Sequence, residues 1–155
     1  MDFSHRLLLY RDRPAYGLIL KLIIVVVPVL SLIGSVTLLL SGDSSGAMVL
    51  LFETFFIVFI FWAVFPRWYQ VYEDHLRIVL GGPFSVKIRF DNIKTITVTS
   101  GLSLTANYVT RFTRNPVVIG VKKGLSVAIT PQDSDLFIES ANSALSRWLE
   151  AGAVE

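Results

Sequence analysis

The sequence predicts a membrane α-hairpin followed by a mostly-β domain (α+β overall) that a C-terminal helix caps. Two long apolar runs occupy the first 65 residues, short alternating apolar and polar runs fill the middle of the chain, and an amphipathic segment ends it. Only 17% of the 155 residues are charged, against about 25% in an ordinary soluble domain, and 53% are hydrophobic. This composition is typical of a protein with membrane-spanning segments.

The first apolar run covers residues 18–40 and carries a single charge, Lys21. At about 1.5 Å per residue, a helix of this length measures roughly 34 Å and crosses a hydrocarbon core of about 30 Å. A cleaved signal peptide is the alternative, but its apolar core spans about 7–15 residues. This run is longer and starts only after Arg11 and Arg13. We therefore expect an uncleaved transmembrane helix.

The second apolar run covers residues 47–65 and ends at Pro66. It holds 13 Leu, Ile, Val or Phe residues, and each contributes about 0.3–0.6 kcal/mol to insertion at a central position. Their sum exceeds the cost of Glu53, the one acid in the run, which is about 3 kcal/mol at most. Residues 41–46 are turn formers and connect the two helices.

Glu53 has two interpretations. It is either an intramembrane polar contact to a proton, a cation or a partner, or a carboxylate less than two turns from the outer interface that reaches water or stays protonated.

Basic residues set the expected orientation. Arg6, Arg11 and Arg13 precede the first span, Lys21 lies near its start and Arg67 follows the second span, whereas the connecting loop has no Lys or Arg. Short segments rich in Lys and Arg stay in the cytoplasm. We expect a multi-pass protein of the inner or plasma membrane with both termini cytoplasmic.

Beyond Pro66 the pattern changes to period-two alternation, which predicts strands separated by turn residues. The predicted strands cover residues 68–73, 76–80, 84–90, 93–99, 117–122 and 125–130. Residues 100–116 are either a long loop or contain a seventh strand around Tyr108. Strands at this spacing favour an antiparallel meander closed into a barrel or sandwich. The expected division is therefore residues 1–66, an arm and the hairpin, and residues 67–155, a cytoplasmic domain.

A helix should end the chain. Thr130 is a suitable cap, Pro131 fits the first helical position, and Asp133 suits the positive end of the helix dipole. Phe137, Ala141 and later residues recur at helical spacing, so one face of this helix should pack on the strands.

Several motifs together resemble the bacterial pleckstrin-homology-like domains. They lie at residues 69–78, 81–83, 88–93, 117–122, 125–130 and 130–138. The resemblance covers about residues 68–149 and implies strongly bent antiparallel sheets capped by a C-terminal helix. It also implies a binding or assembly module. Eukaryotic relatives that bind inositol phosphates carry basic residues in the first hairpin loop, where this chain has Glu73 and Asp74, so phosphoinositide recognition is not expected.

The sequence offers no catalytic signature. It has no cysteine, which excludes disulfides and thiolate chemistry, and its two histidines, His5 and His75, lack metal-ligand spacing. We expect His75 to be an exposed turn residue. No nucleophile elbow or phosphate-binding glycine loop is present. We expect no enzyme activity, no cofactor and no metal.

The candidate binding residues are basic: Lys87, Arg89, Arg111, Arg114, Lys122 and Lys123. They are either simply solvated, or contact an anionic lipid surface, or bind a protein partner. A net charge of +2 is too small to indicate nucleic-acid binding.

Two functions follow from these observations. The first is a membrane-anchored module that presents its cytoplasmic domain for protein or anionic lipid contact. The alternative is a small accessory subunit that docks onto a larger membrane complex through its helices, at Ser31, Gly34 and Glu53.

Overall fold

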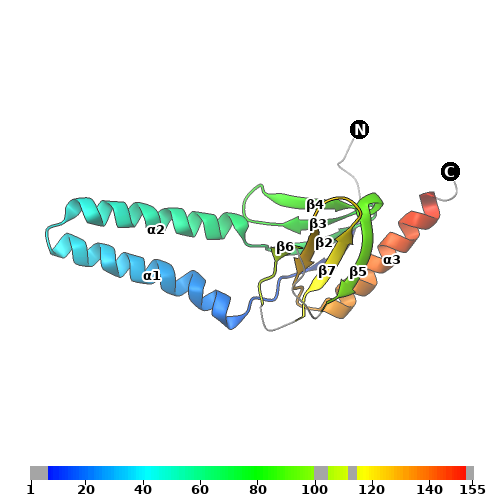
Figure 1. The fold of residues 1–155 in the computed structure, drawn as a ribbon, viewed down its shortest axis with the longest axis horizontal. Coiled ribbons are helices and arrows are strands. Elements are labelled where there is room, and N and C mark those ends of the chain that lie inside the picture. The colour runs from blue at the N-terminus through cyan, green and yellow to red at the C-terminus, as the bar shows by residue number, and fades with distance from the viewer. Residues whose placement is uncertain (1–6, 100–104, 112–114, 153–155) are drawn as a thin grey trace.

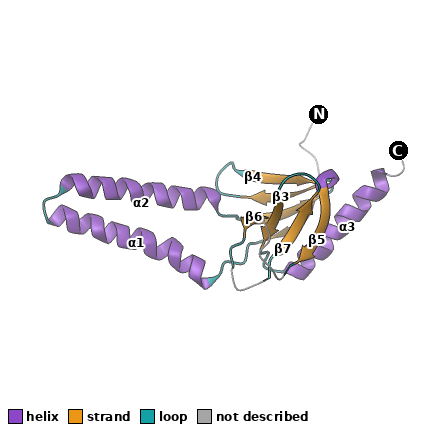
Figure 2. Ribbon diagram, in the orientation of Figure 1, coloured by secondary structure: helices purple, strands orange, loops and turns teal. Residues whose placement is uncertain are grey.

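The computed structural model describes residues 7–99, 105–111 and 115–152, which form a helical hairpin joined to a two-sheet domain (Figure 1). The helices are α1 (Leu18–Leu40), α2 (Ser44–Val64) and α3 (Ser134–Gly152), with a short 3-10 helix η1 (Phe90–Asn92). The strands are β1 (Leu8–Asp12), β2 (Trp68–Tyr72), β3 (His75–Val79), β4 (Ser85–Arg89), β5 (Ile93–Val98), β6 (Thr105–Tyr108), β7 (Val117–Val121) and β8 (Ser126–Ile129). The hairpin projects from one end of the domain, and α3 lies against the strands (Figure 2).

The hairpin helices have the predicted ranges, except that α2 begins three residues early because Asp43 caps it. The backbone N–H of Gly46 donates to Asp43 Oδ1 at 2.9 Å. Both helices are long and apolar enough to cross a membrane. Only 6% and 11% of their most apolar windows are buried in the structure, so neither is packed like the core helix of a soluble protein.

Small polar residues hold the hairpin together near its loop. Ser35 Oγ donates to the Ala47 carbonyl at 3.0 Å, and Thr54 Oγ1 donates to Ser31 Oγ at 2.6 Å. Ser35 and Ala47 are fully buried between the helices. Towards the domain, α1 and α2 diverge (Figure 1).

The first sheet has the order β1-β2-β3-β4, with all neighbours antiparallel. The sequence pattern predicts no strand before residue 68, but β1 comes from the arm that precedes the first helix. Its Tyr10 ring packs edge-on against Phe137 of α3, with 6.4 Å between ring centroids. The arm is thus a structural part of the domain.

The second sheet has the order β5-β7-β8-β6. The stretch around Tyr108 is a strand, as one of the two alternatives predicted. The expected meander is wrong here, because β7 takes the place beside β5 and β6 pairs in parallel with β8. The hydroxyl of Tyr69 donates to the Tyr108 carbonyl at 3.0 Å, and this hydrogen bond helps to hold β6 beside β8. Burial raises the pKa of this hydroxyl far above its ordinary value.

The core lies between the two sheets and α3, and within it Phe137 packs edge-on against Tyr69. The predicted start of α3 is wrong by three residues: the helix begins at Ser134, and Asp133 caps it by accepting from the N–H of Leu136 at 3.1 Å. Thr130 does not cap the helix, because its hydroxyl accepts from the N–H of Thr110 at 2.9 Å. Pro131 forms an isolated bridge with Pro14.

Residues 12–17, which we call the clamp, join β1 to α1 and are bonded to the domain along their whole length. The bonds, donor first, are Asp133 N to Asp12 Oδ2 (2.9 Å), Gln132 N to Arg13 O (2.8 Å), Ala15 N to Thr130 O (2.8 Å), Thr110 Oγ1 to Ala15 O (2.8 Å) and Gly17 N to Thr110 O (2.8 Å). Because every second residue of the clamp is held, α1 starts from a fixed point on the domain.

The end of α2 is fixed as well. The N–H of Arg67 donates to Val79 O at 2.7 Å, and the N–H of Gly81 donates to Ala63 O at 3.3 Å. A Cβ at Gly81 would overlap the carbonyl of Trp62, so only glycine allows this close approach. Both connections between hairpin and domain are therefore short and hydrogen-bonded.

Replacing Thr110 by valine tests the clamp. Thr110 is fully buried, and its hydroxyl bonds both Ala15 O and Thr130 Oγ1. The substitution Thr110→Val leaves these buried groups without that partner and should lower the free energy of unfolding by about 1–3 kcal/mol. Chemical denaturation in detergent, followed by tryptophan fluorescence, measures this. Thr97→Val, at an exposed position of β5, is the matched control and should have little effect. Equal stability of the two variants would contradict the role of the clamp.

Candidate functional site

One face of the first sheet collects positive charge, and we call it the basic face. Residues in register on antiparallel strands point to the same side of a sheet. Arg11 is in register with Gln70, Gln70 with Arg77, and Arg77 with Lys87. Arg89 follows on the same side of β4, and no position in register on this side of β1–β4 is acidic. The face therefore carries four cationic side chains.

Two of these cations, Arg11 and Arg89, have an aromatic ring or a carboxylate as a neighbour. The Arg11 guanidinium lies 3.5 Å from the centre of the Trp68 ring. Arg89 Nη2 pairs with Asp91 Oδ2 at 2.9 Å, outside the strand. Arg77 and Lys87 lie directly opposite each other, an arrangement that destabilises a sheet.

The structure divides the predicted basic residues among three places. Lys87 and Arg89 lie on the basic face. Lys122 and Lys123 form the turn between β7 and β8, where their backbone N–H groups donate to Asn92 at 2.7 and 2.9 Å. Arg111 lies next to Gly17, at the start of α1. Arg114 lies outside the described residues, and so does His5.

These places differ in their position along the domain. Ser85 begins β4 beside the turn that contacts the end of α2, and Arg89 is at the opposite end of the strand. Asn92 follows directly, so Lys122 and Lys123 also lie at the end away from the hairpin. Arg111 is at the hairpin end. Sequence reasoning missed Arg11 and Arg77, because only the pairing register shows that they share the face of Lys87.

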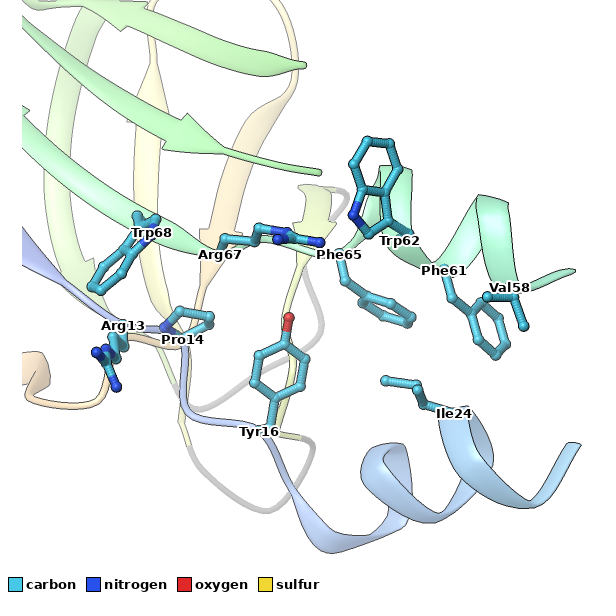
Figure 3. Close-up of a pocket in the computed structure, with 10 residues that line it drawn as sticks. All are labelled: Arg13, Pro14, Tyr16, Ile24, Val58, Phe61, Trp62, Phe65, Arg67 and Trp68. Carbon is cyan, nitrogen blue, oxygen red and sulfur yellow. The ribbon is translucent and has the colours of Figure 1, made fainter. Parts of the chain in front are cut away.

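A second feature, the junction pocket, is a cavity of about 610 Å³ where the hairpin meets the domain (Figure 3). Its lining residues are Arg13, Pro14, Tyr16, Ile24, Val58, Phe61, Trp62, Phe65, Arg67 and Trp68. In Figure 3, Arg13 and Trp68 lie on the domain side and the side chain of Arg67 extends towards Trp62, whereas Ile24, Val58, Phe61 and Phe65 form an apolar wall on the hairpin side. The pocket is thus amphipathic along its length.

Tyr16 stands in the middle of this pocket. Its hydroxyl donates to the Pro66 carbonyl at 2.6 Å, and its ring meets Phe65 edge-on at 6.3 Å between centroids. Burial raises the pKa of Tyr16 against the opposing effect of Arg67, so the phenol stays neutral. The guanidinium of Arg67 lies 5.5 Å from the Trp62 ring, and that of Arg13 lies 4.9 Å from the Trp68 ring.

Glu53 lies on the exposed side of α2, whereas the neighbouring Thr54 faces α1. Because α2 begins at Ser44, Glu53 is about two and a half turns from the start of the helix, and not less than two turns as predicted from the sequence. Ser31 and Gly34, the other two candidates for docking, are occupied within the hairpin. Ser31 bonds Thr54, and a Cβ at Gly34 would lie 3.0 Å from Leu50.

His75 is not the exposed turn residue that we expected. It is the first residue of β3, it is only 6% exposed, and its ring stacks on Tyr72 at 4.5 Å between centroids. Its Nδ1 lies 2.5 Å from Asp74 Oδ1. Within the described ranges, no group of three or more His, Asp or Glu residues has the arrangement of a metal site.

Removing one of the opposed cations should stabilise the domain. The substitution Arg77→Gln ends the repulsion across β3 and β4 and should raise the free energy of unfolding by about 0.2–1 kcal/mol at low salt. The gain should shrink in 1 M NaCl, where charges are screened beyond about 3 Å. Denaturation curves at both salt concentrations measure it, with Lys94→Gln on β5 as the control. A stability loss in Arg77→Gln that does not depend on salt would refute the repulsion.

Comparison with known proteins agrees with this architecture. Residues 67–143 match the family described as the bacterial PH domain. A search of curated proteins and a search of solved structures gave no match. The matched segment runs from the start of β2 into α3 and leaves the hairpin and β1 outside. The chain is therefore a bacterial PH domain protein with two candidate membrane-spanning helices ahead of the domain.

Proposed function

We propose that this protein is a membrane-anchored binding module that holds its PH domain at the cytoplasmic surface and binds an acidic segment of a protein partner on the basic face. The observation that carries the proposal is the row of Arg11, Arg77, Lys87 and Arg89 on one side of a sheet fixed to the hairpin. Binding, and not catalysis, is the activity that such a surface supports.

Exposure and charge support the membrane placement. Most apolar side chains of α1 and α2 are not covered by other parts of the protein. Exposing them to water would cost free energy, and a lipid bilayer as the surrounding solvent removes that cost. Arg13, Lys21 and Arg67 lie at the domain end of the hairpin, while the loop has no Lys or Arg. By the positive-inside rule, the domain and both termini are cytoplasmic and the loop is on the other side.

The direction of the basic face favours a protein over a lipid surface. β3 and β4 run roughly along the hairpin (Figure 1), so the face is turned sideways and not towards the bilayer. From Ser85 to Arg89 the strand extends about 13 Å, further than the Debye length of about 8 Å at physiological salt. A membrane would therefore attract mainly the near end of the face, whereas a neighbouring protein can cover all of it.

Site-specific crosslinking tests this function. A photo-reactive amino acid at Ser85, on the basic face, should give one discrete protein adduct in intact membranes. The double change Arg77→Glu and Lys87→Glu should lower its yield at least fivefold, since it reverses two charges. The matched reversal Lys122→Glu and Lys123→Glu, at the far turn, should leave the yield unchanged. An adduct that survives reversal of the basic face would refute the proposal, and so would one that is lost with the control pair.

The second candidate function, an accessory subunit that docks through its helices, is favoured by one observation. Glu53 is exposed in the middle part of α2, where an uncompensated carboxylate costs about 3 kcal/mol and calls for a partner group. The same crosslinking experiment separates the two functions. Loss of the adduct in Glu53→Leu, with reversal of the basic face tolerated, would favour docking through the helices.

A further inference from the structure

We propose that the junction pocket binds one anionic glycerophospholipid of the cytoplasmic leaflet, with its phosphate-containing headgroup at the polar end, which Arg13 and Arg67 line, and an acyl chain between α1 and α2. This inference rests on the membrane placement proposed above, but not on the protein partner. It concerns a place in the molecule different from the basic face.

The apolar part of the pocket lies at the depth in the membrane where lipid acyl chains are found. Ile24 lies six residues into α1 and Val58 lies six residues before the end of α2, so each is about 9 Å inside its helix. Phe61 and Phe65 complete this wall, with 5.5 Å between their ring centroids. In the proposed orientation this wall reaches into the hydrocarbon layer, where an acyl chain is the available filler.

The polar part of the pocket has the chemistry of a phosphate site. Arg13 and Arg67 are exposed, and among the described residues neither has a carboxylate within ion-pair distance. Guanidinium groups bind phosphate through paired hydrogen bonds. Both guanidinium groups lie close to tryptophan rings, which limits their motion, and Trp and Tyr side chains favour the level of lipid headgroups.

Charge and shape together select the occupant. A soluble anion would satisfy the arginines but leave the wall of Ile24, Val58 and Phe61 without a partner. A purely apolar ligand would leave two cations without an anion. A volume of about 610 Å³ lies within the usual range for small-molecule sites and accommodates a headgroup with the first part of a chain. An anionic phospholipid satisfies both ends.

Native mass spectrometry of the full-length protein tests the site. Protein in detergent is mixed with palmitoyl-oleoyl phosphatidylglycerol, or with the phosphatidylcholine of the same chains. The wild type should retain one phosphatidylglycerol at least fivefold more than phosphatidylcholine. The double variant Arg13→Gln and Arg67→Gln should lose this preference, whereas Lys122→Gln and Lys123→Gln, which removes the same charge elsewhere, should keep it. Equal retention of the two lipids by the wild type would overturn the site, as would equal loss in both double variants.

Two further experiments identify the source of the phosphate and the role of the acyl chain. Glycerol phosphate at millimolar concentration should not displace the lipid, and displacement would show a site for soluble phosphates instead. Ile24→Phe narrows the apolar part of the pocket without changing its charge and should lower the retention of phosphatidylglycerol at least threefold. Val36→Phe, at an exposed position near the loop, should not lower it. Extraction of the protein from membranes by carbonate would refute the membrane placement itself. Resistance to carbonate without lipid retention would refute the lipid site alone.

Discussion

The hydrogen-bonded clamp at residues 12–17 is the constraint on which the rest of the arrangement depends. It connects a strand in the first sheet to a helix of the hairpin, and between them it is bonded to Thr110 and Thr130, which follow β6 and β8 of the second sheet. An arm that binds two sheets in succession cannot swing. The clamp therefore fixes the orientation of the PH domain relative to the helical hairpin.

The same constraint explains why the helices diverge and why a pocket lies between them. α1 starts from Gly17, which is bonded to Thr110 beside the second sheet, whereas α2 runs directly into β2 of the first sheet. The domain ends of the two helices are thus held at different sheets. Near the loop, Ser35 and Ala47 instead allow close contact. Aromatic side chains occupy part of the space that remains at the domain end, and the junction pocket is the rest.

Local sequence signals predicted the elements well, because their causes are local. Apolar runs longer than 18 residues and alternating strands depend on neighbours in sequence. For this reason α1 kept its predicted bounds, and the six strands predicted between residues 68 and 130 were found, whereas β6 was only one of two alternatives. β1 was missed because Leu7, Leu8 and Leu9 are consecutive and show no alternation. The start of α3 was misplaced because Pro131 suits a helix start, whereas the bridge with Pro14 that occupies it is a long-range contact.

The candidate sites were harder to predict, since they depend on contacts between distant segments. The alternating pattern alone predicts that Lys87 and Arg89 are exposed. That Arg11 and Arg77 lie on the same face depends on the pairing register of three pairs of strands. The junction pocket combines residues near 13–16, 24 and 58–68, and no local motif joins these segments. Trp and Tyr side chains favour the level of lipid headgroups, but this preference does not predict that Tyr16, Trp62 and Trp68 assemble around one cavity.

A distance measurement between the hairpin and the domain tests most directly whether their relative orientation is fixed. The chain has no cysteine, so spin labels can be placed without removing any native residue. Labels at Leu32→Cys on α1 and Asn142→Cys on α3, measured by double electron–electron resonance in lipid nanodiscs, should give a single distribution. It should be about as narrow as that of a reference pair within the domain, Thr97→Cys and Asn142→Cys. A distribution several times broader than the reference would show that the domain swings on its anchor and would contradict the account.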